Sequence, residues 1–491
     1  MKPAFDNDKY IRIQSEHIRE RIEQFGNKLY LELGGKLFDD LHASRVLPGF
    51  LPDSKLRMLT QLRDSLEIVI VISAEDIERN KVRQDLGITY DEDVLRLREA
   101  FMERGFMVSS VVITHYAGQR SADAYRQRLE RQGIKTYFHY IIEGYPHNVE
   151  LIASEDGFGR NEYVETTRPL VVVTAPGPGS GKMAVCLSQL YNEHARGRVA
   201  GYAKFETFPV WSLPLKHPVN VAYEAATADI QDVNMIDPFH LDAYGKTAVN
   251  YNRDIEIFPV LDALFTSIYG VSPYKSPTDM GVNMVGFCIS DDEACREASK
   301  QEIIRRYFHA LCRMANGAVN DAEIQKLALL QKQVGINTAY RKTVVAARER
   351  REQTGGERPF SHAAAIELED GRIITAEAGL LLGSSAALLL NVMKELAGID
   401  HAVQLIPQDM IEPIQHTKIE YLHGRNPRLH TDEVLVALSV LAVNDENCRR
   451  ALATLPLLKG CQMHSTVMLK DVDLRTFAKL GVELTSDPAR K

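Results

Sequence analysis

Short apolar runs alternate with amphipathic helical patterns through the first part of the chain. Consecutive apolar or β-branched residues, typical of strands buried on both faces of a sheet, occur at 28–35, 66–74, 108–118, 134–144 and 168–174. Helical patterns occupy 91–105 and 121–133, and Ser121 is placed to cap the first turn of the second. Strands that alternate with helices predict an α/β fold with a mostly parallel sheet.

The pattern changes twice further along the chain. After a predicted strand at 197–211, a long segment to about residue 290 is rich in Asp, Asn, Tyr, His and Pro. The aromatic residues distributed along this segment predict that it is ordered. Helical patterns then continue to "TGGERP" (354–359), a predicted linker. We therefore expect an α/β domain with a P-loop-like phosphate site at 1–290, a helical segment at 291–355 and a C-terminal α+β domain at 356–491.

Composition and charge narrow the class of protein. The 491 residues carry a formal charge of -8 and show no basic run, which argues against nucleic-acid binding. The six cysteines are scattered without a CxxC pair, as in a reducing compartment. The N-terminus lacks the apolar core of a signal peptide, and no window has the roughly 18 apolar residues of a membrane span. These features predict a cytoplasmic protein without membrane partners, and they leave a homo-oligomer open.

The stretch "LVVVTAPGPGSGKMAVCLSQLY" (170–191) carries the first candidate chemistry. A strand runs into a loop with three glycines and a lysine, and a helix follows, as in a phosphate-binding loop. Two usual residues are absent, because Pro176 replaces the leading glycine and Met183 replaces the hydroxyl that binds Mg²⁺. The glycines still permit a nest of N–H groups at a positive helix end. The predicted phosphate contacts are Gly177, Gly179, Ser180, Gly181 and Lys182; the alternative is a purely structural turn.

A second candidate lies at the end of the strand after the loop helix. Within "AGYAKFETFP" (200–209), Lys204 and Glu206 are the polar residues expected at a strand end. "AGYAKFE" resembles an element of the dethiobiotin synthetase and CTP synthase group of P-loop enzymes. That resemblance implies that Lys204 and Glu206 face phosphates and metal in an enzyme that uses ATP to activate a carboxylate or carbonyl oxygen. The alternative is a solvated lysine and glutamate.

The polar segment supplies the predicted metal ligands. Asp229, Asp232, Asp237 and Asp254 are the carboxylates expected to hold the Mg²⁺ that Met183 cannot bind. Arg253, next to Asp254, is expected to stabilise charge on a transferring phosphoryl group, so that Lys204, Glu206 and Arg253 are the predicted catalytic residues. For any single one of these side chains, a cap or a salt bridge is the alternative.

A different chemistry is suggested near the C-terminus. "GCQMHST" (460–466) places Cys461 and His464 three residues apart, downstream of three further histidines. This pattern fits a thiol–imidazole pair or half of a zinc site, and a structural role is the alternative.

Several long motifs together resemble one known family. "PLVVVTAPGPGSGKMAVCLSQLY", "AGYAKFETFP" and "VNYNRDIEIFPVL" resemble the uncharacterised bacterial family labelled domain of unknown function 1846 (uncharacterised protein family 0371), over nearly the full chain. The resemblance implies a bacterial protein with a separate C-terminal domain and supplies no activity. From the residues, we expect a nucleotide- or phosphate-binding protein that uses ATP or a related nucleotide with Mg²⁺ in phosphoryl transfer or carboxylate activation of a small molecule. The alternatives are a non-catalytic protein that binds a phosphorylated metabolite and a thiol or zinc hydrolase.

Overall fold

The chain divides into two compact units in the computed structural model, which describes residues 3–35, 37–38, 40–83, 86–318, 321–354 and 362–489. The N-terminal unit contains the described residues up to Glu224 together with Ile230–Ala298. The C-terminal unit contains Ala225–Asp229 and the described residues from Ser299 onward. The predicted linker at 354–359 lies outside the described residues except for Thr354.

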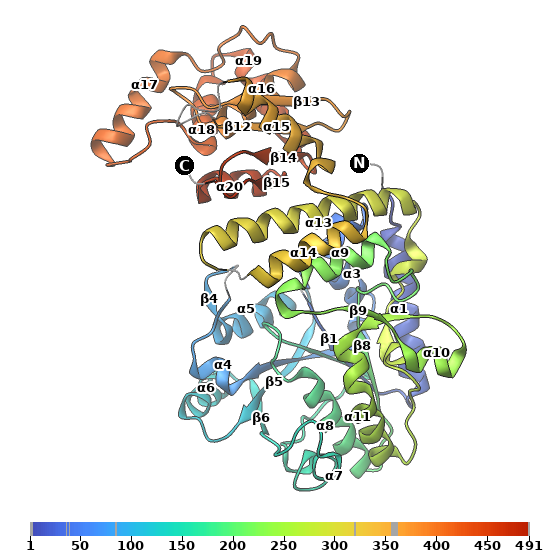
Figure 1. Cartoon of the computed structure of the whole chain (residues 1–491). Coiled ribbons are helices and arrows are strands. Elements are labelled where there is room, and N and C mark those ends of the chain that lie inside the picture. The colour runs from blue at the N-terminus through green and yellow to red at the C-terminus, as the bar shows by residue number, and fades with distance from the viewer. Residues whose placement is uncertain are drawn as a thin grey trace. The chain divides into compact units, whose positions relative to one another are not determined.

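A seven-stranded parallel sheet forms the centre of the N-terminal unit among the described residues (Figure 1). Its strands, in spatial order, are β11 (Gly281–Val282), β8 (Gly201–Phe205), β1 (Leu29–Leu33), β7 (Leu170–Thr174), β2 (Leu66–Ser73), β5 (Met107–Tyr116) and β6 (Lys135–Tyr140). Every residue of β2 and of β7 is buried, as consecutive apolar runs predict for strands covered on both faces. The α/β class with a large parallel sheet is confirmed.

Helices cover both faces of this sheet. α8 (Lys182–Ala195) packs on β1, β7 and β8, and it also contacts α11 (Asn252–Tyr269), which in turn contacts α7 (Val149–Ile152) (Figure 1). α5 (Tyr90–Met102) packs on β2 and β5. The other α-helices of this unit are α1 (Asn7–Gln24), α2 (Leu41–Val46), α3 (Ser54–Thr60), α4 (Ala74–Glu78), α6 (Arg120–Arg131), α9 (Pro218–Ala226, which continues into the C-terminal unit), α10 (Pro238–Tyr244) and α12 (Pro277–Met280).

Two short antiparallel pairs complete the N-terminal unit. β3 (Val82–Arg83) pairs with β4 (Ile88–Thr89), and β9 (Asn234–Ile236) pairs with β10 (Val249–Tyr251). The second pair lies in the polar segment, which is ordered as its aromatic residues predict and also contains the 18 residues of α11. The cap prediction at Ser121 is wrong, because α6 begins at Arg120 with Gln119 at its N-cap.

The C-terminal unit has its own sheet and core. β13 (Ile373–Glu377), β12 (Ala363–Glu367), β14 (Gln462–Ser465) and β15 (Glu483–Ser486) form a mixed sheet in that order, in which only β14 and β15 are parallel. Its helices include α13 (Asp292–Ala315, which begins in the N-terminal unit), α14 (Asp321–Gln333), α15 (Lys342–Gln353), α16 (Ser384–Ala397), α17 (Gln408–His416), α18 (Thr431–Leu441), α19 (Glu446–Ala453) and α20 (Asp471–Lys479). None of the helices in the described ranges combines the length and apolar character needed to cross a lipid bilayer.

Candidate functional site

The glycine loop connects β7 to α8, as the sequence predicts. β7 ends at Thr174, and α8 begins at Lys182 with Gly181 as its N-cap. Gly179 and Gly181 have φ angles of 76° and 84°, in the left-handed region that residues with a side chain rarely adopt. The glycines at these two positions are therefore required by the path of the backbone.

Side chains from two neighbouring elements hold the loop in place. A Cβ added to Gly177 would lie 2.3 Å from the hydroxyl oxygen of Tyr90, so the loop and the start of α5 are in direct contact. The Thr114 hydroxyl, near the end of β5, donates a 2.6 Å hydrogen bond to the carbonyl of Ser180. The loop is consequently fixed against β5 and α5, while its carbonyls supply the internal hydrogen bonds.

The N–H groups of the loop have no such partners among the residues that the structure describes. Within the described ranges, no hydrogen bond uses the backbone N–H of Gly177, Gly179, Ser180, Lys182 or Met183. The first helical bond here runs from the N–H of Val185 to the carbonyl of Gly181. A helix leaves its first N–H groups unsatisfied, and they carry the positive end of its dipole. The loop therefore offers donors to an anion.

Lys182 adds a full charge at the same helix end. Its side chain is half-buried and makes no hydrogen bond or ion pair to another described residue. Lys182 is the first residue of α8 and follows directly on the loop that carries the amide donors. This is the arrangement that favours a phosphate over a neutral ligand.

The strand order places this loop where ligands bind in open parallel sheets. After β7 the chain crosses β1 to reach β8, whereas after β2 it moves in the opposite direction to β5. Right-handed crossovers that leave in opposite directions put their helices on opposite faces of the sheet. The carboxyl ends of β7 and β2 therefore flank a topological switch point, the usual ligand site of such folds.

Lys204 and Glu206 lie in a polar cluster on the same face of the sheet as α8. Lys204 is an ion-pair partner of Asp254 on α11, and its Nζ lies 3.0 Å from Oε1 of Glu206. Glu32 pairs in register with Lys204 and accepts a 2.7 Å hydrogen bond from the Tyr202 hydroxyl. The structure thus gathers three carboxylates around one lysine, from β1, α11 and the end of β8.

Burial and charge set the protonation of this cluster. Burial, together with the Asp254 carboxylate, raises the pKa of Glu206 to about 7, although Lys204 acts in the opposite direction. Burial lowers the pKa of Lys204, but the carboxylates of Asp254, Glu206 and Glu32 outweigh it and raise that pKa overall. Lys204 is held as an ammonium ion, and Glu206 is the group that can take up or release a proton near neutral pH.

The register of the edge strand makes room for Glu206. Gly281 on β11 pairs with Lys204, and a Cβ at Gly281 would lie 3.2 Å from Oε2 of Glu206. A side chain at this position would press on the carboxylate. The short strand β11 is therefore part of the site, although its two residues gave no signal in the sequence.

The predicted catalytic and metal residues from the polar segment do not gather at one point. Arg253 forms an ion pair with buried Asp232, with Nε 2.5 Å from Oδ1. Asp237 caps α10 and accepts a 2.6 Å hydrogen bond from the Thr278 hydroxyl. Asp229 lies exposed on a separate turn.

These positions leave no metal site of the predicted kind. Asp254 alone of the four aspartates reaches Lys204 and Glu206, and the described residues contain no group of three His, Cys, Asp or Glu that could hold a metal ion. The four aspartates do not form the predicted metal site, because Asp232 and Asp237 bind other side chains and Asp229 is exposed on the surface.

The structure also brings in residues that the sequence analysis missed. Glu32 is the one charged residue of β1. A single acid within an apolar run is a signal in the sequence that could have identified it. His115, at the carboxyl end of β5, has φ 53°, and its Nδ1 lies 3.1 Å from the Ser73 hydroxyl at the end of β2. The pairing of β5 with β6 is irregular between Ile113 and Tyr116. A bulge of this kind re-aims side chains at the edge of a sheet, and single sequences do not reveal it.

Cys461 and His464 have separate environments in the C-terminal unit. The Cys461 thiol contacts the Leu457 carbonyl, while Nδ1 of His464 lies 2.9 Å from the Thr485 hydroxyl. Burial raises the pKa of the Cys461 thiol and lowers that of the His464 ring. At strand geometry, a spacing of three residues directs side chains to opposite faces. These features favour structural roles for both residues.

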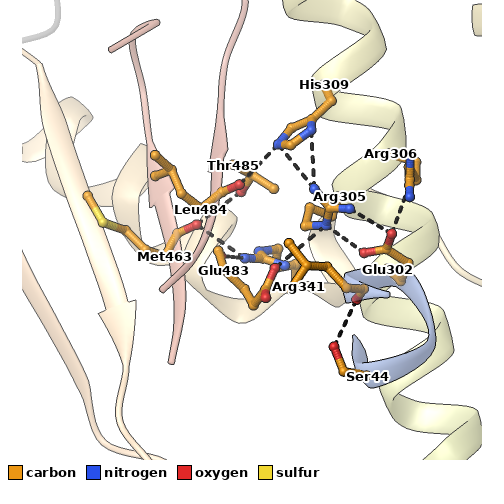
Figure 2. Close-up of polar contacts among 11 residues, drawn as sticks. Ser44, Glu302, Arg305, Arg306, His309, Arg341, Met463, Glu483, Leu484 and Thr485 are labelled. Atoms are coloured by element: carbon orange, nitrogen blue, oxygen red, sulfur yellow. Dashed lines mark hydrogen bonds and ion pairs between the residues drawn. The ribbon is translucent and has the colours of Figure 1, made fainter. Parts of the chain in front are cut away.

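A second buried polar cluster lies in the C-terminal unit (Figure 2). The Arg305 guanidinium donates two hydrogen bonds, of 2.5 and 2.6 Å, to the Glu302 carboxylate, and both side chains are buried. Arg341 donates to the carbonyls of Met463 and Glu483, and burial lowers its pKa to about 9. Arg341 thus ties the start of α15 to β14 and β15, and a 3.7 Å ion pair between Nε of Arg305 and Oε2 of Glu483 ties α13 to β15.

Comparisons with known proteins place the whole chain in one family. The model described as Domain of unknown function DUF1846, N-terminal, matches residues 3–335, and the corresponding C-terminal model matches residues 339–491. A UPF0371 protein of Corynebacterium efficiens is 57% identical over 489 residues, covering 99% of this chain and 98% of the relative. A UPF0371 protein of Streptococcus thermophilus is 54% identical over 487 residues, with the same coverage. Neither name states an activity. The chain therefore belongs to the DUF1846 family, as its motifs predicted.

Proposed function

We propose that the loop from Gly177 to Lys182 binds the phosphate groups of ATP or a related nucleotide. The observation that carries this proposal is the set of unengaged N–H groups at the start of α8, beside a switch point of the parallel sheet. Lys182 supplies the charge that accompanies those donors. In this role the glycines permit the turn, and Thr114 and Tyr90 keep it rigid.

We further propose an enzyme that transfers a phosphoryl group to a small molecule or activates its carboxylate. Lys204 and Glu206 supply a fixed positive charge and a carboxyl group whose pKa lies near neutrality. In its ionised form a group of this kind can accept a proton from an attacking hydroxyl, whereas an attacking carboxylate is already ionised and can use the positive charge of Lys204. Arg253 is committed to Asp232, so its predicted role on a phosphoryl group would need that ion pair to open.

The predicted Mg²⁺ site fits these residues poorly. Met183 offers no oxygen ligand, Asp232 and Asp237 are engaged by Arg253 and Thr278, and Asp254 is engaged by Lys204. Magnesium that accompanies a nucleotide would depend on Asp254 or Glu206. The same observation favours a second candidate, a protein that binds a phosphorylated metabolite on the loop without turnover.

Ligand-induced thermal stabilisation tests both candidates. Full-length protein is heated with ATP, GTP, tripolyphosphate or inorganic phosphate, each with and without Mg²⁺. Stabilisation by a nucleotide above that by simple phosphates supports the enzyme, whereas an equal, metal-independent response supports the metabolite-binding protein. Hydrolysis of ATP in the presence of candidate hydroxyl and carboxylate compounds then separates turnover from binding.

A lysine variant with a matched control makes the test specific to the loop. Lys182→Ala should weaken phosphate or nucleotide binding at least about tenfold, since it removes a charge from the anion's contacts. Lys246→Ala changes an exposed lysine at the end of α10 and should leave binding unchanged. If the Lys182 variant binds as tightly as the unmodified protein, the loop is not the phosphate site.

A further inference from the structure

α18 in the C-terminal unit carries apolar residues on its solvent face as well as on its buried face. Val434, Ala437 and Leu438 point into the core of the unit and are nine-tenths or more buried. On the other side, Val436, Val440 and Val443 are 65%, 61% and 73% exposed. An ordinary surface helix has charged or polar residues opposite its buried stripe. This helix instead presents a second apolar stripe to solvent.

The three valines form one continuous surface. Their spacing of four and three residues places them on one side of the helix and of the turn that continues it. Single exposed apolar residues are common on proteins, but a stripe along one helix is a feature of interaction sites. We call Val436, Val440 and Val443 the valine stripe.

An exposed acid precedes the valine stripe, and an exposed arginine that is paired with Glu446 follows it. Asp432, one helical turn before Val436, is exposed at the N-terminal end. Arg449 lies at the other end, because its Nε donates a hydrogen bond of 3.4 Å to the carbonyl of Ala442. Arg449 also pairs with Glu446, but that pair is more than half exposed and therefore weak.

From this arrangement we infer that the valine stripe binds the same stripe of a second copy of the chain. A two-fold axis between Val436 and Val440 would align two α18 helices in antiparallel fashion, with Val436 of each copy against Val440 of the other. The same axis brings Asp432 of each copy to Arg449 of the other. A surface with an acid at one end and a base at the other is complementary to itself under this symmetry, as an isologous interface requires.

The length of the stripe sets the strength of the association. Residues 436–443 span only about 10 Å of helix, which is a small contact by the standard of permanent dimers. The dimer is therefore weak and depends on protein concentration.

Sedimentation velocity of the full-length protein across the micromolar range tests the inference. The unmodified chain should shift from monomer to dimer as concentration rises, and Val440→Asp should remain monomeric because each copy would bury a charge. Val271→Asp, at a valine that is 74% exposed in the N-terminal unit, is the matched control and should dimerise normally. Circular dichroism establishes that both variants are folded.

A charge exchange tests the proposed geometry. Asp432→Arg alone and Arg449→Asp alone should each weaken dimerisation about tenfold or more, since each places like charges together. The double variant restores opposite charges and should recover most of the affinity. A chain that stays monomeric at every concentration, a Val440→Asp variant that still dimerises, or a double variant without recovery would each overturn the inference.

Discussion

The Nζ atom of Lys204 lies 3.0 Å from Oε1 of Glu206, yet burial and the Asp254 carboxylate still raise the pKa of Glu206 to about 7. The folded protein therefore favours the protonated form of Glu206 more than the unfolded chain does. The stability that follows is fully present below the ordinary pKa of a glutamic acid and is lost as pH rises through about 7.

Replacing Glu206 with glutamine should remove this dependence. Between pH 5 and 8, we expect the unmodified protein to lose on the order of 2 kcal/mol of stability relative to Glu206→Gln, since one pKa unit corresponds to about 1.4 kcal/mol. Urea denaturation midpoints of both proteins across this range provide the measurement. Parallel pH profiles for the two proteins would show that Glu206 does not titrate in this window.

Alanine substitutions at two loop glycines should have different costs. Gly177→Ala places a Cβ 2.3 Å from the Tyr90 hydroxyl oxygen and should destabilise the protein by about 2 kcal/mol or more, because Tyr90 is buried and must move. Gly179→Ala has open space around its Cβ but keeps a φ of 76°, which costs about 1 kcal/mol.

A double variant identifies the cause of the larger cost. Gly177→Ala combined with Tyr90→Ala should be less destabilised than the sum of the two single changes, because the clash has been removed. The losses of stability are measured by denaturation of the four proteins. If the losses of the two single variants add up to that of the double variant, contact with Tyr90 is not the cause of the destabilisation by Gly177→Ala.

The buried pair of Arg305 and Glu302 should be sensitive to single changes. Glu302→Ala leaves the buried Arg305 guanidinium without the carboxylate that accepts its two short hydrogen bonds, which should cost about 3–5 kcal/mol. Replacing both residues with leucine should cost clearly less than the two single changes together. The measurement is a double-mutant cycle on the free energy of unfolding, obtained by urea denaturation of the four proteins. A double replacement that costs as much as the sum would contradict the assignment.

The backbone at His115 should decide which side chains this position accepts. Its φ of 53° is tolerated by asparagine but not by β-branched residues. We therefore expect His115→Asn to stay within about 0.5 kcal/mol of the unmodified protein, and His115→Val to lose about 1–2 kcal/mol or more. Thermal denaturation of the two variants gives the comparison, and equal stability for both would argue against the left-handed backbone.

Local sequence was sufficient for much of the N-terminal unit. Short apolar runs such as Leu66–Ser73, rich in β-branched residues, are typical of strands that a sheet buries on both faces, so their length and composition predicted buried parallel strands. Gly179 and Gly181 likewise indicated a turn with a backbone that other residues rarely adopt, and the predicted helix after this turn, α8, is confirmed. These features depend on interactions within a few residues of the chain.

The polar cluster could not be found in this way. Lys204, Glu206 and Asp254 are all candidates from the sequence. The sequence does not show that Asp254 lies in the first turn of an 18-residue helix and reaches Lys204, nor that Glu32 pairs in register with Lys204. The four aspartates looked equivalent because their spacing along the chain carries no information about their partners.

Apolar periodicity and the glycine pattern are local properties of the chain, and they were enough to predict the buried strands of the large sheet and the turn before α8. The position of β1 between β7 and β8, and with it the set of charged side chains that meet, does not follow from local patterns. Strand order and ion pairing depend on packing and desolvation among segments that lie far apart in the chain.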